Sequence, residues 1–160
     1  MALLRLVHIV AGGFWAGSVM LLGWFIVPSA RDAGPGAGPF MQALLKRRLP
    51  AIMIGTGVVT VLAGLWLWAW RMPSLERWQG WAIAIGAVSA IGALVIGIGW
   101  QRPTAAKVQA LGAEISGAGS PPTPEQGAEM GRLQAKMAGY ASVLAVLLTL
   151  ALAGMALGGS

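Results

Sequence analysis

The chain has 160 residues, of which 57% are hydrophobic and only 10% are charged, whereas a soluble domain carries about 25% charged residues. This composition predicts an integral membrane protein and argues against a soluble enzyme. The net charge of +6 does not indicate a nucleic-acid-binding protein. The basic residues lie between long apolar runs, where topology determinants and lipid-headgroup anchors occur. The absence of cysteine excludes disulfides, thiol catalysis and thiolate metal sites.

Four apolar segments are long enough to cross a bilayer, which takes about 20 helical residues. They are residues 6–27, 51–70, 81–100 and 140–157. Backbone polar groups in hydrocarbon must be satisfied within the segment, so each segment is predicted to be helical. We therefore expect an all-α protein in which one membrane domain, residues 1–160, forms an up-and-down four-helix bundle. Small residues four positions apart predict close helix contacts, and these pairs are Gly13 and Gly17, Gly86 and Ala90, and Gly154 and Gly158.

The charge of the connections predicts the orientation. Eight of the 11 Lys and Arg residues fall in the connections 28–50 and 101–139, and three fall at the N-terminus or between the second and third segments. The positive-inside rule then puts both termini outside and the two longer connections in the cytoplasm. The high alanine, glycine and proline content is compatible with a GC-rich bacterial genome. We therefore expect a multi-pass protein of the bacterial cytoplasmic (inner) membrane.

The first cytoplasmic connection combines a turn with a short helix. Residues 28–39 are rich in glycine and proline and predict a turn. Residues 40–49 place apolar side chains on one side and end in a basic cluster, which is typical of a helix at the lipid headgroups. Pro50 follows and is predicted to open the second spanning helix.

The second cytoplasmic connection, residues 101–139, is predicted to be a helical hairpin that extends the third and fourth spans. Val108, Leu111 and Ile115 recur at helical spacing after Thr104. The stretch from Thr123 to Gln126 has an N-cap, a proline at the first helical position and a glutamine at the third, which predicts a new helix start. We favour a hairpin packed on itself, and the alternative is a docking surface for a partner.

Aromatic residues gather at the predicted outer surface. Five of the eight tryptophans surround the short connection between the second and third segments, at positions 66, 68, 70, 78 and 81. Tryptophan is enriched at membrane interfaces, so an aromatic belt is the simplest interpretation. His8, the only histidine, begins the first segment on that same side.

His8, Gly12 and Trp15 follow helical spacing and share one face of the first segment. A glycine one turn from a histidine leaves room for a flat ligand such as a porphyrin. Two interpretations remain open. His8 is either a ligand of a metal or cofactor, or it donates a hydrogen bond to a group on a neighbouring helix. Ionisable residues inside a membrane are functional candidates by default.

The first segment resembles a known family. It contains His8, then six residues, Trp15, one more residue and Gly17. This pattern is similar to the first-helix signature of the copper-resistance protein D family and of the related HemJ-type protoporphyrinogen oxidases. The resemblance covers residues 3–31, where Pro28 and Arg31 also fit. It implies a membrane helical bundle in which His8 is an axial ligand of haem b. The arginine late in the first span and the lysine in a later span of HemJ-type enzymes are absent, and so are the additional histidines of copper-handling relatives. Any second ligand would be a water, a residue of another chain or a methionine such as Met20 or Met53.

These observations favour a protein without catalytic residues of its own. The spanning segments contain no nucleophile–base pair, no metal triad and no proton relay. We expect an accessory or scaffold subunit, in contact with lipid, that joins other membrane subunits of an electron-transfer or energy-transducing complex. The contacts would use the small-residue helix faces and the hairpin 101–139. The alternative function is a b-type haem-binding redox module that uses His8, and transport has the least support because no polar pathway is visible.

Overall fold

The computed structural model describes residues 1–71 and 77–158, and these residues are almost entirely helical. The helices in chain order are α1 (Ala2–Leu21), η1 (Leu22–Ile26), α2 (Val27–Asp32), η2 (Gly34–Ala37), α3 (Gly38–Lys46), α4 (Leu49–Arg71), α5 (Arg77–Ile96), η4 (Gly97–Gln101), α6 (Arg102–Gly117) and α7 (Pro124–Gly158). Within the described residues, four continuous helices are long and apolar enough to cross a membrane: Ala2–Asp32, Leu49–Trp70, Arg77–Gly117 and Pro124–Gly158. For the described residues, the predicted all-α class is confirmed, and so is the presence of four helices that are long and apolar enough to span a membrane.

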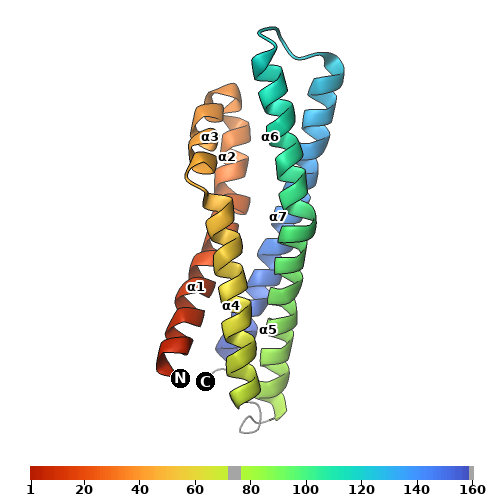
Figure 1. Cartoon of the computed structure of the whole chain (residues 1–160). Coiled ribbons are helices and arrows are strands. Elements are labelled where there is room, and N and C mark those ends of the chain that lie inside the picture. Colours follow the sequence, from red (N-terminus) through yellow and green to blue (C-terminus); the bar gives the residue numbers. More distant parts are fainter. Residues whose placement is uncertain (72–76, 159–160) are drawn as a thin grey trace.

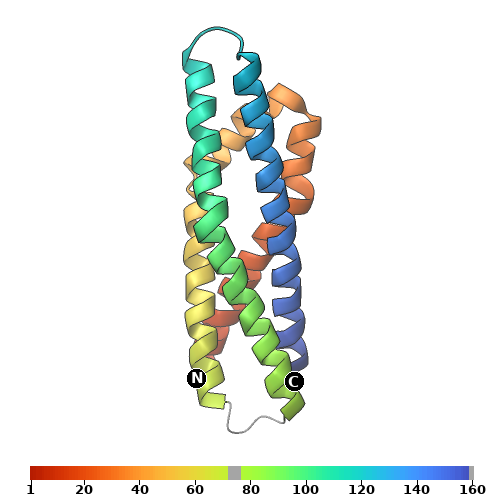
Figure 2. The same cartoon turned by 90° about the vertical axis from the view of Figure 1, so that its right-hand side faces the viewer.

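The helices form two antiparallel pairs. α1 lies along α4, and α5 lies along the C-terminal half of α7 (Figure 1). α6 continues α5 and lies along the N-terminal half of α7, so that α7 runs the whole length of the molecule (Figure 2). Both termini lie at one end, and α2, α3 and the turn between α6 and α7 lie at the other (Figure 1). Most of the basic residues are thus at the end opposite the termini.

Two π-helical turns let the first and third spans continue past a proline. The predicted turn over residues 28–39 is shorter than expected, because helix α2 extends through Pro28 to Asp32. A proline ring clashes with the carbonyl four residues earlier and lacks an N–H. In η1 the backbone hydrogen bonds span five residues instead of four, and the Val27 N–H donates to the oxygen of Leu22. η4 does the same before Pro103, where the Arg102 N–H donates to the oxygen of Gly97. A π turn relieves the clash without ending the helix.

The backbones of α5 and α7 approach each other closely at two glycines of α7. A Cβ atom added at Gly154 would lie 2.5 Å from the oxygen of Ala82 and 2.9 Å from the Cα of Gly86. A Cβ atom at Gly158 would lie 2.8 Å from the oxygen of Gln79. These small residues therefore bring two backbones together, as their spacing predicted.

The predicted pair on α1 behaves differently. Neither Gly13 nor Gly17 has a heavy atom within 4 Å of the position of a Cβ atom, so this pair makes no close contact inside the chain. The glycine of α1 that does meet another helix is Gly12. The prediction of a tight contact through Gly13 and Gly17 is therefore wrong for contacts within this chain.

The buried core joins both helix pairs. It contains a tryptophan, an alanine and a valine from α1, two alanines from α5, and two leucines and an alanine from α7. Its buried members are Trp15, Ala16, Val19, Ala90, Ala93, Leu144, Leu148 and Ala151. Most other large apolar side chains of the spanning helices are exposed, as expected of residues that face lipid.

The tip between α6 and α7 has the predicted capping chemistry. The Gln126 N–H donates to Thr123 Oγ1 at 3.3 Å, and the Thr123 N–H donates to Gln126 Oε1 at 3.0 Å. This is a reciprocal capping box at the start of α7. Gln126 Nε2 also donates to Glu114 on α6 at 2.9 Å. Leu133 is buried, and the Met130 methyl lies 3.9 Å from the position of a Cβ atom at Gly112, so α7 contacts α6 here.

The first turns of α7 are expected to lose stability in acid. Hydrogen bonds of 2.7 Å from Arg132 lower the pKa of Glu129 below its ordinary value of 4.5, and hydrogen bonds from its own backbone N–H and then from Thr123 lower the pKa of Glu125. A lowered folded-state pKa stabilises the helix above about pH 4.5, and this stabilisation is lost as pH falls through the lowered value. Amide protection over residues 125–132, corrected for intrinsic exchange, should fall across that window. The double variant E125Q/E129Q should show no such fall, and an equal fall in this variant would contradict the assignment.

Candidate functional site

His8 donates a hydrogen bond to the neighbouring helix. Its Nδ1 lies 2.8 Å from the carbonyl oxygen of Thr60 on α4. A carbonyl oxygen only accepts hydrogen bonds, so Nδ1 carries the proton. In the neutral imidazole this fixes Nε2 as an acceptor. Within residues 1–71 and 77–158, no group donates to Nε2.

A glycine on α4 makes room for the imidazole. A Cβ atom added at Gly64 would lie 2.7 Å from His8 Cε1 and 3.1 Å from His8 Nδ1. No side chain fits between the ring and the α4 backbone at this point. The ring is therefore held by a hydrogen bond at Thr60 and by the surface of Gly64 one turn later.

Gly12 and Trp15 also contact α4. The Thr60 hydroxyl donates to the oxygen of Thr56 at 2.7 Å, and the Thr60 methyl lies 3.1 Å from the position of a Cβ atom at Gly12. The space predicted beside Gly12 for a flat ligand is thus occupied, on this side, by a methyl group. Trp15 is only 6% exposed. A Cβ atom added at Gly57 would lie 2.8 Å from its Cε2 atom.

The His8–Trp15 spacing on α1 therefore matches a glycine spacing on α4. His8 and Trp15 are seven residues apart, and so are their partners, Gly64 and Gly57. Because the two helices are antiparallel, two large flat side chains of α1 enter two gaps of α4 at the same interval. The sequence brings all three predicted residues, His8, Gly12 and Trp15, to one face, and the structure places that face against α4.

A cavity of about 240 Å³ lies beside this contact. All four spanning helices line it, and the lining residues whose side chains carry an N–H, N or O–H group are His8, Trp15 and Thr60. The other lining residues are Ile9, Gly12, Gly13, Ala16, Val61, Gly64, Leu65, Ala87, Ala90, Ile91, Leu148, Ala151, Leu152 and Met155. The cavity is therefore an apolar site with few polar groups, which is the usual form of a small-molecule site.

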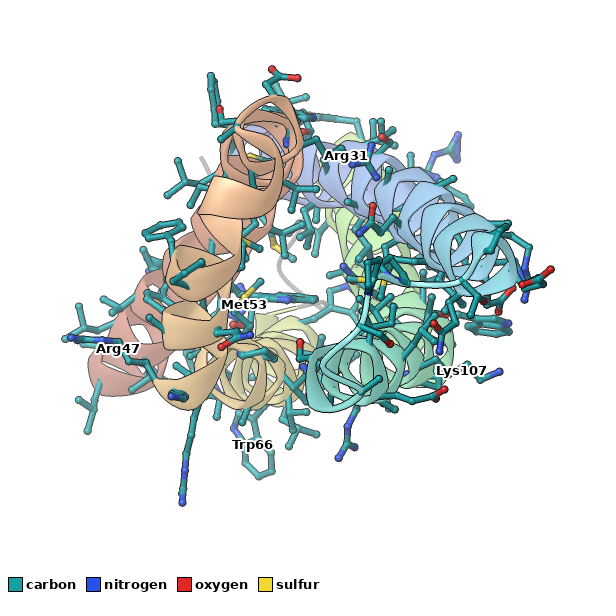
Figure 3. The ribbon with its side chains drawn as sticks, turned by 90° about the horizontal axis from the view of Figure 1, so that it is seen from above. Arg31, Arg47, Met53, Trp66 and Lys107 are labelled. Atoms are coloured by element: carbon teal, nitrogen blue, oxygen red, sulfur yellow. The ribbon has the colours of Figure 1, made fainter. Side chains whose placement is uncertain are left out.

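The methionines suggested as a second ligand are not beside His8. Met20 follows His8 by 12 residues on the same helix, which is about 18 Å along the axis. Met53 points into the bundle (Figure 3), but neither residue lines the cavity. Met155 does line it, and no pattern in the sequence singles this residue out. Within the described residues, no cluster of three His, Cys, Asp or Glu side chains is suited to a metal.

The cavity does not fit a porphyrin. Its volume lies below the range of about 300–1,000 Å³ that is typical of small-molecule sites. The Thr60 methyl fills the space beside Gly12 that a flat macrocycle would need. Haem ligation by His8 stays a prediction from the resemblance, and no step of the function is derived through it.

The tryptophan cluster lies at the same end as His8 and mostly faces outward. Trp66, Trp70, Trp78 and Trp81 are exposed, and Figure 3 shows Trp66 pointing away from the bundle. The indole nitrogen of Trp68 is buried and has no acceptor among the described residues. The four exposed side chains suit an interfacial belt.

No protein-family model matches the chain, and no curated protein or solved structure matches it. The likeness of residues 3–31 to the copper-resistance protein D and HemJ-type families therefore stays a prediction.

Proposed function

We propose that the chain is a non-catalytic subunit of a larger membrane complex, and that α1 is the helix through which it joins a partner. The observation that carries this proposal is the pair Gly13 and Gly17. Both residues are exposed in an apolar helix, and nothing lies within 4 Å of the position of a Cβ atom at either. Small residues four apart allow a second helix to approach closely in lipid.

The polar groups of the spanning helices support a structural role. The hydroxyls of Thr56, Thr60, Ser142 and Thr149 each donate to a carbonyl one turn earlier in their own helix. These hydroxyls are used inside the helices and are not paired with a base. A nucleophile needs an adjacent base to act at neutral pH. The subunit would thus contribute helix surfaces, and the chemistry would belong to its partners, in an electron-transfer or energy-transducing complex.

The proposed orientation has both termini outside the bacterial cytoplasmic membrane. The end that carries α2, α3 and the α6–α7 tip is the basic end and would be cytoplasmic. At this end Arg31 donates to the oxygen of Gln134 on α7 at 2.7 Å, which ties the first connection to the hairpin. Figure 3 shows Arg47 pointing away from the helices, where it would meet anionic headgroups.

The partner contact is tested by substituting Gly17. Leucine at this position is expected to block the approach of a second helix, because its side chain would fill the groove that glycine leaves open. In mild detergent the wild-type chain should have a native mass above that of its monomer, and G17L should shift it to the monomer. G55L is the matched control, since Gly55 is also an exposed, open glycine of an apolar helix. A wild-type chain that is a lone monomer would overturn the proposal.

The absorption spectrum of the same preparation tests the alternative function. A Soret band that disappears in H8A would establish the haem-binding module in place of a structural subunit. A colourless preparation from haem-replete cells would eliminate it.

A further inference from the structure

We propose that the cavity beside His8 binds the ring of a neutral phenol or quinol, whose hydroxyl donates a hydrogen bond to Nε2 of His8. This site does not depend on the subunit role proposed above, because His8 and the cavity beside it lie within one chain, although Gly13 also lines the cavity. The volume, polarity and access of the cavity each restrict the ligand.

The volume indicates a single substituted ring. A cavity of about 150 Å³ in an apolar protein core binds benzene. The cavity beside His8 has a volume of about 240 Å³, which leaves room for ring substituents. It is smaller than the sites of about 300 Å³ and above that hold drug-sized molecules. The volume therefore suits one ring, and any longer part of the ligand would extend out of the cavity.

The hydrogen-bond inventory requires a donor on the ligand. Thr60 uses its carbonyl to hold Nδ1 of His8 and its hydroxyl proton to bond Thr56, so neither can donate into the cavity. Nε2 of His8 is left as an acceptor without a partner among the described residues. His8 lines the cavity, so an O–H group on a ligand held there can supply the donor that Nε2 lacks. Trp15, two turns along α1, also lines the cavity.

The charge of the lining requires a neutral ligand. No Asp, Glu, Lys or Arg is among the residues that line the cavity. An ionised ligand would lose its hydration without gaining an opposite charge, which is far more costly than burying a hydroxyl. Carboxylates, phosphates and amines are therefore poor ligands for this site. A phenol is neutral near pH 7, since its pKa is about 10.

Access is from the surrounding lipid. Ile9 on α1 is 66% exposed and Leu152 on α7 is 45% exposed, and both line the cavity. These exposed apolar side chains place the cavity next to the apolar surface of the molecule. A ligand that reaches this surface is dissolved in the membrane, and an apolar tail on its ring would remain among the lipids. A membrane quinol meets all four requirements.

The reduced form is expected to bind more tightly than the oxidised form. A quinol has the O–H group that Nε2 accepts, whereas a quinone has only acceptors. Loss of one hydrogen bond is worth about 1 kcal/mol, which corresponds to about fivefold in affinity. Titration calorimetry in lipid nanodiscs should therefore show a quinol with a ten-carbon tail binding about fivefold more tightly than its quinone and than its dimethyl ether. Equal affinity for the three probes would overturn the proposal.

Two variants locate the site. H8F keeps a ring against Gly64 but lacks Nε2, so it should bind the quinol and its dimethyl ether equally. A87L fills the cavity from α5 and should abolish binding of every probe, while A84L is the matched control because Ala84 does not line the cavity. Binding of the quinol to A87L at wild-type affinity would overturn the location. The comparison of probes on the wild-type chain remains decisive if H8F fails to fold.

A tail-less trimethylhydroquinone separates the two sources of the ligand. If it binds at least tenfold more weakly than the tailed quinol, the ligand is a membrane quinol, as the lipid-facing side of the cavity predicts. If the two bind equally, the tail contributes nothing and the membrane assignment is wrong. Binding of neither probe overturns the whole proposal.

Discussion

Replacing Gly154 by leucine is expected to lower the free energy of unfolding by about 3 kcal/mol or more, the upper range for an overpacked core. A Cβ atom at this position would lie 2.5 Å from the oxygen of Ala82 and 2.9 Å from both the Cα and the nitrogen of Gly86. All three atoms belong to the backbone of α5, so no side chain can turn aside. The two helices would have to separate along their closest contact.

Separation of α5 from α7 would spread beyond this point. Gly158 meets α5 one turn later, where a Cβ atom would lie 2.8 Å from the oxygen of Gln79. On the other side of Gly154, Ala151 and Leu148 belong to the buried core. In lipid no hydrophobic effect draws the helices together again, because lipid tails are as apolar as the core, and packing supplies most of the attraction.

The measurement is equilibrium unfolding in mixed micelles of mild and denaturing detergent, followed by loss of the folded signal. G139L is the matched control, since Gly139 lies on the same helix with open space around it. We expect G139L to unfold within about 0.5 kcal/mol of the wild-type chain, as surface substitutions do. If G154L were as stable as G139L, the close contact between α5 and α7 would be wrong.

The number and approximate position of the apolar helices could be predicted because lipid imposes a minimum apolar length. A segment without internal hydrogen bonds is not stable in hydrocarbon, so apolar length alone identifies a helix. The start of α7 could also be predicted, because the capping residues Thr123 and Gln126 bond to atoms only three residues away. Such features depend on the local sequence and need no knowledge of the other helices.

Helix rotation could not be predicted. Small residues show where a close approach is sterically allowed, but not which helix lies opposite. Gly13 and Gly17 have the favoured spacing, yet Gly12 is the glycine of α1 that meets α4, at Thr60. A rotation of α1 by one residue, about 100°, decides between them. That rotation is fixed by Trp15 and His8, whose rings need the gaps at Gly57 and Gly64.

The candidate site was found only in part, for the same reason. The histidine was identifiable as the only imidazole in an apolar helix. Its acceptor, the carbonyl oxygen of Thr60, is a backbone atom and carries no sequence signal. Met155 joins the cavity through the packing of α7 on the other helices, and Met20 and Met53, which are closer to the core, do not. The continuation of helix past Pro28 also escaped prediction, because a π turn has no distinctive sequence.

The second large effect is expected at Trp15. Truncation to alanine should lower the free energy of unfolding by about 3 kcal/mol or more, as for other buried tryptophans. Trp15 is the largest side chain of the buried core, and its ring lies between Gly57 of α4 and the rest of that core. Its removal would leave a void that the small residues around it cannot fill.

A substitution on the facing helix, at Gly57 of α4, gives a sharper test of the same contact. In G57A the added methyl group would lie 2.8 Å from Trp15 Cε2 and 3.1 Å from Leu94 Cδ1. Trp15 cannot move without disturbing the core, so G57A alone should cost about 1–3 kcal/mol. In the W15A background the ring is absent, and the same methyl group should cost nothing or restore part of the lost packing. The double-mutant cycle over W15A and G57A should therefore give a coupling of about 1–2 kcal/mol, within the range for residues in contact.

This cycle also decides what the histidine–tryptophan spacing means. If the spacing serves packing against Gly57 and Gly64, the coupling is present in the protein as purified, with no ligand added. If Trp15 were instead held by a bound cofactor, removing that cofactor would abolish the coupling, and the added methyl group of G57A would cost the same in both backgrounds. Additive effects of W15A and G57A would thus contradict the contact between Trp15 and α4. The measured coupling tests whether the interval of seven residues on α1 exists because α4 has the same interval between its two glycines.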